Sequence, residues 1–252
     1  MRMQLATWPE VETYLRTSVG VILPIGSTEQ HGPTGFVGTD ALTAEMIAIE
    51  VGAKIDAMVA PTISVGMAQH HLGFPGSMTL RPSTLICVIQ DMINSLAHHG
   101  FERFFFLNGH GGNVATLTAA FAEVYAESSF GTAASNRPSL RCILRNWYMG
   151  EKVRKISKEA FGDDEGSHAT ASEVALTYFG FPNDADRVAR VPLDPARAPT
   201  GTIYDADDYR RQFPDGRIGS NPGLATEALG KQLFEASVEE LCEDYCKFIE
   251  TA

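Results

Sequence analysis

The sequence predicts an α/β fold with a mostly parallel central sheet and helices on both of its faces. Four short, mainly apolar runs are predicted to form strands: 19–25, 58–61, 103–107 and 140–144. Of these, 19–25 and 103–107 are typical of buried strands. Segments with helical periodicity lie between these runs, and strand–helix alternation is the pattern of a parallel sheet. The 252 residues are 44% hydrophobic, which is enough for one large domain. Because no composition break marks a linker, we expect residues 1–252 to form a single domain.

Proline, glycine and capping residues set the expected limits of the first elements. Residues 9–17 are predicted to form a short helix that Pro9 opens, because proline is favoured in the first helical turn. The loop after the first strand is rich in glycine and proline, so it stays irregular. Thr39 or Asp40 is then suited to N-cap an amphipathic helix over 41–51.

The middle of the chain repeats the same alternation. A helix is predicted over 82–99, and Gly100 is suited to end it. The buried strand that follows leads through a glycine-rich turn, 108–113, into a helix over 114–127. This turn therefore lies between a strand and a helix.

The last third of the chain is less regular. Residues 150–166 are polar, and 166–176 are expected to form a loop that enters a helix. Residues 182–221 are rich in Pro, Gly, Asp and Arg, so we expect surface loops with little regular structure. A final helix is predicted from Pro222 to about residue 249, since its apolar positions recur at helical spacing.

Composition argues against several classes of protein. The net charge of −11 leaves no basic stripe for nucleic acid, and no apolar run reaches the roughly 18 residues of a membrane span. The first residues lack the apolar core of a signal peptide, so we expect a cytoplasmic protein. Its cysteines are expected to be reduced and buried: Cys87, Cys142, Cys242 and Cys246. The last two share a helical face, where core packing is favoured over a metal or redox pair.

The turn at 108–113, Asn-Gly-His-Gly-Gly-Asn, is the strongest functional signal. It places His110 at the carboxyl end of a buried strand, where open α/β sheets bind ligands. A tight turn in which the histidine only fills space is one alternative. A phosphate loop before a helix N-terminus is another, but the Gly-x-Gly-x-x-Gly spacing and a Walker lysine are both missing.

Glu29, His31 and Asp40 are expected to converge with His110. Glu29 and His31 are two residues apart, so in an extended segment their side chains point to the same side. Loops after neighbouring parallel strands emerge at the same edge of the sheet. Carboxylates and imidazoles are the ligands of zinc, manganese and iron(II), and a bridging carboxylate is what a two-metal site needs. The alternative for Asp40 is a simple helix cap.

Two other pairs of side chains are open to more than one interpretation. His70 and His71 either line the site or pack beneath it. Trp147 and Tyr148 follow a strand end, where they either stack on a planar substrate or pack at the edge of the sheet.

The sequence closely resembles the creatininase (creatinine amidohydrolase) family. The resemblance rests on five segments in the expected order: 23–40, 71–76, 108–113, 168–173 and 219–226. It implies a three-layer αβα fold that is often assembled as a hexamer, so we expect a homo-oligomer. It also implies hydrolysis of a C–N amide bond by two divalent metal ions. The implied small-molecule substrate is a cyclic amide such as creatinine, or a formamide or peptide-like amide.

The resemblance also assigns roles to individual residues. Four fall on the family's metal ligands, with Asp40 bridging: Glu29, His31, Asp40 and His110. Creatininase proper has a further ligand, a glutamate, where this chain has Gly112, and relatives with the Gly-Gly form take that carboxylate from a later segment. Glu173 matches there, so it is implied to complete the catalytic site.

His168 falls on the histidine proposed as the proton shuttle. The residues after it, Thr170 and Ala171, differ from the Gly-Glu usual in the family. This departure leaves open a protein on the same fold that binds metal for a binding or assembly role and has lost catalysis. The metal itself is open among zinc, manganese and iron(II).

Overall fold

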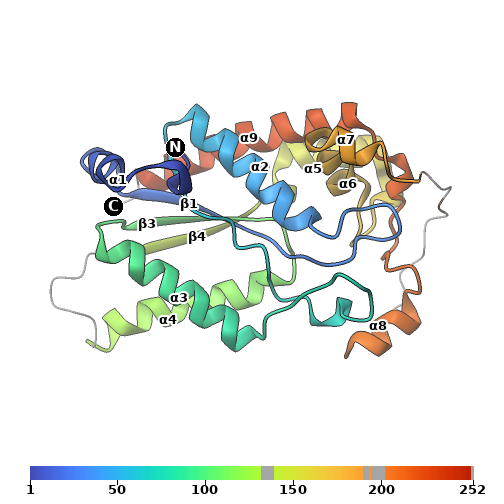
Figure 1. Ribbon diagram of the computed structural model, residues 1–252, viewed down its shortest axis with the longest axis horizontal. Helices are drawn as coiled ribbons and strands as arrows, with labels where there is room; N and C mark the ends of the chain where they lie inside the picture. Colours follow the sequence, from blue (N-terminus) through green and yellow to red (C-terminus); the bar gives the residue numbers. More distant parts are fainter. Residues whose placement is uncertain (132–138, 190–192, 194–201, 251–252) are drawn as a thin grey trace.

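A four-stranded parallel sheet lies between layers of helices in the computed structural model, which describes residues 1–131, 139–189, 193 and 202–250 (Figure 1). The strands follow the order β2-β1-β3-β4. Their bounds are Gly20–Ile25 for β1, Met58–Val59 for β2, Arg103–Asn108 for β3 and Arg141–Asn146 for β4. Every neighbouring pair is parallel, which confirms the predicted three-layer α/β fold.

Strand β3 shows why the central strands are apolar at every position. Successive side chains of a strand point to opposite faces, and here both faces are covered. Phe105 packs into the core on the side of α2 and α9, whereas Phe104 and Phe106 pack on the side of α3 and α4. A continuous apolar run is therefore required.

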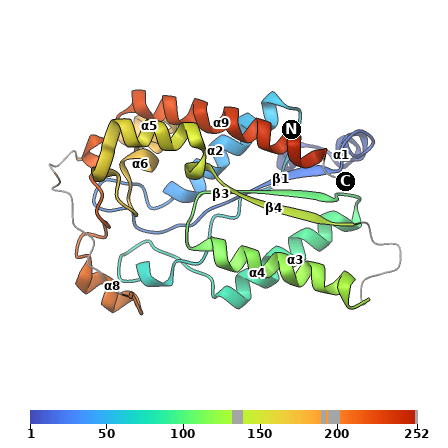
Figure 2. The ribbon, with the colours of Figure 1, turned by 180° about the vertical axis from the view of Figure 1, so that it is seen from behind.

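Helices α3 (Pro82–His98) and α4 (Asn113–Ser129) cover one face of the sheet, as both views show (Figures 1 and 2). Helices α2 (Thr39–Lys54) and α9 (Glu227–Ile249) cover the other face. Helix α6 (Ala171–Gly180) packs against both α2 and α9. This packing brings the start of α6 to the carboxyl ends of the strands.

The remaining helices are peripheral. They are α1 (Trp8–Leu15), α5 (Glu151–Phe161), α7 (Pro182–Ala185) and α8 (Ala206–Gln212). Short 3-10 turns occur at Met3–Leu5, Gln69–His71, Trp147–Met149, Gly162–Glu165 and Pro222–Leu224. No helix among the described residues is long and apolar enough to cross a membrane.

Two expected helix starts are wrong. Helix α2 begins at Thr39 after the N-cap residue Gly38, so neither Thr39 nor Asp40 is the cap. The Asp40 carboxylate is engaged by histidines instead. Helix α9 begins later than Pro222, because Thr226 caps it by accepting a hydrogen bond from Leu229 N.

Three helices fall where the sequence predicted none: α5, α8 and the short α7, which lies with α8 in the expected surface loops. Helix α5 occupies the polar interval at 150–166, and its Val153 and Phe161 are buried in the core. Helix α8 lies within the expected surface loops at 182–221, where Tyr209 is fully buried. Other parts of that interval, 190–192 and 194–201, lie outside the described residues.

The prediction of buried cysteines is wrong, since Cys142 and Cys242 are only partly buried. Cys87 and Cys246 are exposed. Cys87 lies on the outward side of α3, whose buried residues are Leu85, Ile89, Ile93 and Ala97. The prediction that Cys242 and Cys246 share a packed face is therefore wrong for Cys246.

The start of α2 presses against the strand ends, and Gly109 makes this approach possible. A Cβ atom at Gly109 would lie 2.1 Å from the backbone oxygen of Asp40. We expect Gly109→Ala to lower the free energy of unfolding by about 2 kcal/mol, as overpacking typically does. Urea unfolding measures this loss.

The matched control for that change is Gly111→Ala in the same turn. A Cβ atom there would lie 3.6 Å from Tyr148 Oη, an ordinary contact. Its stability should stay within about 0.5 kcal/mol of the wild type. Equal losses in the two variants would contradict the close-approach argument.

Candidate metal centre

The register of the sheet brings the loops after β1 and β3 together. Ile25 pairs with Asn108 at the ends of these strands. Two asparagines then fix the turn that follows β3. The Asn108 side chain donates to His110 O over 2.6 Å, and the Asn113 side chain donates to Gly26 O over 2.9 Å. His110 is therefore held at the strand edge, 6% exposed.

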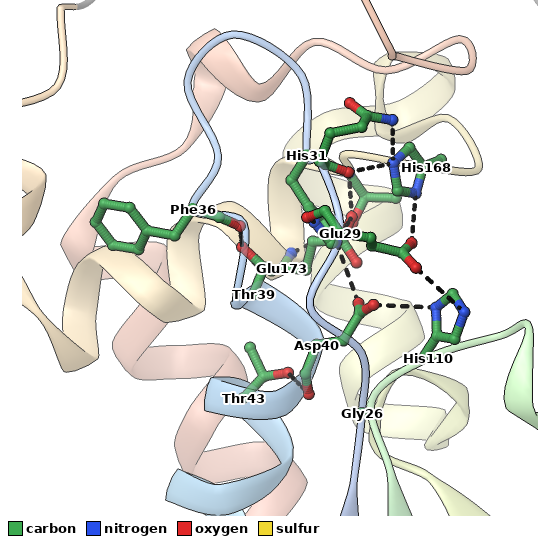
Figure 3. Close-up of polar contacts among 12 residues, drawn as sticks. Gly26, Glu29, His31, Phe36, Thr39, Asp40, Thr43, His110, His168 and Glu173 are labelled. Carbon is green, nitrogen blue, oxygen red and sulfur yellow. Dashed lines mark hydrogen bonds and ion pairs between the residues drawn. The ribbon is translucent and has the colours of Figure 1, made fainter. Parts of the chain in front are cut away.

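Asp40 lies at the centre of the site, between two histidines (Figure 3). Its Oδ1 is 3.1 Å from His31 Nε2, and its Oδ2 is 3.0 Å from His110 Nδ1. The first turn of α2 supplies Asp40, whereas the loop after β1 supplies His31. One carboxylate thus faces two imidazoles, with a different oxygen toward each.

Glu29 is fully buried. It faces Nε2 of His110, whereas Asp40 faces Nδ1 of the same ring. Its Oε2 is 3.3 Å from His110 Nε2, and its Oε1 is 3.7 Å from His168 Nδ1. Neither Glu29 oxygen has a hydrogen-bond partner, and Asp40 Oδ2 has none either. Buried carboxylate oxygens without partners are costly unless a cation binds them.

Glu173 reaches the cluster from the start of α6. Thr170 N donates to Glu173 Oε1 over 2.6 Å, and Glu173 N donates back to Thr170 Oγ1, so the two form a capping box. The same Oε1 lies 3.8 Å from His31 Nε2. Thr170, which departs from the family pattern, therefore positions the carboxylate.

Backbone carbonyls fix both histidines that face Asp40. His31 Nδ1 donates to Glu29 O over 3.0 Å, and His110 Nε2 donates to Met67 O over 3.0 Å. These tautomers follow from the hydrogen-bond network. With a cation in the site, His31 Nε2 and His110 Nδ1 would therefore be the nitrogens that present lone pairs on the side of the carboxylates. Histidines that bind metals are oriented in this way.

The described residues form two groups of three potential ligands that share Asp40. The groups are Glu29 with Asp40 and His110, and His31 with Asp40 and Glu173. A third group joins Glu29, His31 and His168. In each group the ligand atoms lie within 4.8 Å of one another. Carboxylates with imidazoles suit zinc, manganese and iron(II), so these residues fit divalent cations.

The charges of the cluster also suit a cation. Burial raises the pKa of Glu29 to about 8 and that of Glu173 to about 7, although nearby histidines oppose both shifts. Burial would raise the pKa of Asp40 too, but His31 and His110 hold it below its usual value. Burial disfavours charged His31, yet Asp40 and Glu173 raise its pKa to about 10. Three buried carboxylates thus require nearby positive charge.

His168 lies beside the cluster as a neutral imidazole. Burial and the proximity of His31 lower its pKa well below the usual value. Its Nε2 donates to Gln30 O over 2.8 Å, which leaves Nδ1 with a lone pair. The segment at 219–226, which resembles the family, supports the loop around His168, because Ser220 Oγ donates to His168 O over 2.7 Å.

Of the two histidines with open roles, His71 is buried and packs beneath the site. Its ring stacks on His168 with centroids 4.3 Å apart, and its Nε2 lies 3.2 Å from Glu29 Oε1. His70 is only half-buried. Neither belongs to a potential ligand group of the described residues.

A cavity of about 820 Å³ opens onto the site. Asp40, His110, His168 and Glu173 line it, together with Tyr148. Trp147 is buried in the core, so stacking of Trp147 on a substrate is wrong. It follows the strand end as predicted, but its ring turns inward.

The part of the cavity lining that α5 supplies was not predicted from the sequence. This α5 lining consists of five residues: Glu151, Arg154, Lys155, Ser157 and Lys158. The available signal was the spacing of Val153, Ile156 and Phe161, which marks an amphipathic helix. Membership of a cavity wall has no such signal in the sequence.

Comparison with known proteins identifies the family. The sequence matches the family model described as "Creatininase: Creatinine amidohydrolase" over residues 4–245. Creatinine amidohydrolase of Pseudomonas putida is 27% identical over 250 residues, which are 94% of this chain and 93% of that protein. Mycofactocin precursor peptide peptidase of Mycolicibacterium smegmatis is 40% identical over 108 residues, but these are only 40% of this chain and 43% of that protein.

Solved structures show the same fold. A structure described as "Creatininase Mn" has a TM-score of 0.85 and 22% identity, and the match covers 99% of each chain. A mutant creatininase described as "Zn-Zn type" has a TM-score of 0.84 and 22% identity, and the match covers 99% of this chain and 98% of that one. Since the family model spans nearly the whole sequence, this chain belongs to the creatininase (creatinine amidohydrolase) family.

Proposed function

We propose that this protein is a metal-dependent amidohydrolase that cleaves a C–N amide bond of a small molecule. The observation that carries the proposal is the pair of buried ligand groups that share Asp40. The names of its relatives support the reaction class, since a creatinine amidohydrolase and a peptide peptidase both hydrolyse C–N bonds. The substrate is a cyclic amide such as creatinine, or a formamide or peptide-like amide.

Two divalent ions would divide the ligands between them. Glu29 and His110 would hold one ion, His31 and Glu173 the other, and Asp40 would bridge them. Zinc and manganese are the metals named for the neighbouring structures, and the donor set suits iron(II) equally. When bound, such ions lower the pKa of water toward neutrality and polarise a carbonyl group.

His168 is suited to move the proton that this reaction requires. An amine leaves poorly as an anion, so the leaving nitrogen must gain a proton. The Gln30 carbonyl holds the hydrogen on His168 Nε2, which leaves Nδ1 free to accept a proton at the cavity and return it to that nitrogen.

We expect His168→Gln to lower kcat by about a hundredfold to ten-thousandfold, the range typical of general acid–base catalysis. Metal content should stay unchanged, because His168 is outside the two groups that share Asp40. Elemental analysis and steady-state kinetics check both results. The control is His70→Gln, whose half-buried ring lies outside those groups and should leave kcat unchanged. An equal loss in both variants would contradict the role of His168.

The proposal as a whole is tested by metal analysis and an amide panel. We expect about two metal ions per chain in protein purified without chelator, as a bridged two-metal site holds. The metal-loaded protein should hydrolyse at least one of creatinine, N-formyl compounds and short peptides. Absence of metal after reconstitution would overturn the hydrolase proposal. Bound metal with no turnover would favour the non-catalytic binding or assembly protein instead.

The phosphate-loop alternative is disfavoured by charge. The Asp40 and Glu29 carboxylates lie 3.0 and 3.3 Å from His110, inside the loop that would have to hold the phosphate. A phosphate bound in this turn would therefore lie beside two carboxylates, and like charges repel strongly away from water. The alternative also predicts nucleotide binding that does not depend on metal, which the metal-free protein can test.

Three broader properties stay predictions. We infer that residues 1–252 act as a single creatininase-like domain, which the match over 4–245 supports. Family membership supports a homo-oligomer, often a hexamer, and analytical ultracentrifugation measures its size. A cytoplasmic location also stays a prediction.

A further inference from the structure

Three cations line the cavity at the metal centre. Arg154, Lys155 and Lys158 lie on its α5 wall, and all three residues are exposed. Positions three and four residues apart share a helix face, so Lys158 lies on the same face as the other two. Positive charge is therefore concentrated on one wall of the cavity.

These cations lack acidic partners within the described part of the chain. No ion pair joins any of them to a described carboxylate, whereas Lys152 of the same helix pairs with Glu239 at 2.6 Å. The cavity's other acidic residues have different roles. Asp40 and Glu173 belong to the ligand groups, and Glu165 accepts hydrogen bonds from Ser172. Glu151 is the one carboxylate on the α5 lining, so it offsets one of the three positive charges there.

The positive charge of the α5 lining contrasts with the net charge of the chain. The protein carries 31 acidic residues against 20 Lys and Arg, a net charge of −11. Three cations against one carboxylate on the α5 lining of the cavity create a local field that attracts an anion.

We propose that the substrate carries an anionic group, a carboxylate or a phosphate, that Arg154, Lys155 and Lys158 bind. The amide would then lie at the metal centre, whose residues line the same cavity. A volume of about 820 Å³ accommodates a ligand that reaches both the metal centre and the α5 cations. This inference rests on the proposed function, and it selects acidic amides over neutral ones.

The test uses uncleavable probes in pairs, each with one anionic and one neutral member. Levulinate carries a carboxylate beside a ketone, and acetonylacetone replaces that carboxylate with a neutral acetyl group. We expect the zinc-loaded protein to bind levulinate about tenfold more tightly in an NMR titration, since three exposed charge pairs of ordinary strength together give about that factor. Hydroxyacetone phosphate against hydroxyacetone forms the second pair, and the larger preference identifies carboxylate or phosphate.

Variants distinguish anion binding by the α5 cations from anion binding by the metal ion, which also attracts anions. The triple variant Arg154→Gln, Lys155→Gln, Lys158→Gln should lose about the whole tenfold preference. The matched control removes three cations that are paired with acids outside the cavity: Lys152→Gln, Lys231→Gln and Lys247→Gln. It should keep the preference. Zinc content is measured in every sample and should not change.

The outcomes distinguish this inference from the proposed function. Equal binding of charged and neutral probes, or an equal loss in both triple variants, overturns the α5 site. A preference that the α5 triple variant retains also overturns it, because the metal alone then attracts the anion. If the preference depends on α5 but no amide is hydrolysed, the anion site stands and the amidohydrolase proposal fails.

Discussion

Asp40→Asn is expected to abolish hydrolysis and to remove both metal ions. Asp40 is the residue common to the two groups that we assign to the two ions. Asparagine keeps the shape of the side chain but loses its negative charge, and its amide nitrogen cannot bind a cation. Because changes that only support ligands already cost about tenfold to a hundredfold, we expect kcat/KM to fall by at least about a thousandfold. Elemental analysis should find the metal content falling from about two per chain toward zero.

The control for this variant is Glu45→Gln on the same helix. Glu45 lies on the partly exposed side of α2, 3.6 Å from Arg2, so the substitution makes the same change in charge away from the site. Metal content and activity should match the wild type. Circular dichroism of both variants shows whether the fold is kept. Two metals retained by folded Asp40→Asn would refute the bridging role.

The sheet could be predicted because burial on both faces forces a simple pattern. Strands covered by helices on each side must be apolar at nearly every position, and 19–25 and 103–107 are continuous runs of that kind. The helices at α5 and α8 were missed for a physical reason. Both are rich in charged residues, and what holds α8 in place is the packing of Tyr209 and Phe213 against Phe74, far away in the chain.

The two halves of the site differ in how far the sequence could predict them. Glu29, His31 and His110 follow neighbouring parallel strands, so topology alone brings them to one edge. Glu173 has no such link, because its place depends on how α6 packs against α2 and α9. Only the family resemblance indicated it. The cations of α5 were missed because no local pattern reveals which side of an exposed helix faces a cavity.

Glu173→Gln is expected to remove one metal ion and leave the other. Glu173 belongs to only one of the two groups that share Asp40. Glutamine keeps an oxygen that can accept the hydrogen bond from Thr170 N, so the capping box and the fold should survive. We expect metal content to fall from about two to about one per chain, and kcat to fall at least about a hundredfold, since losing a ligand should cost at least as much as losing its support. Elemental analysis and kinetics measure both.

Glu165→Gln is the control, because Glu165 lines the same cavity but lies outside the ligand groups of the described residues. It should retain two metals.

A glutamate in the turn at 108–113, where creatininase proper is expected to carry one, should not replace the carboxylate of Glu173. A Cβ atom at Gly112 would lie 2.4 Å from His110 Nε2 and 2.6 Å from Met67 O. Adding Gly112→Glu to Glu173→Gln would therefore displace His110, and metal content should fall further. Restoration of two metals by that double variant would mean that α6 is not the necessary source of the carboxylate in this chain.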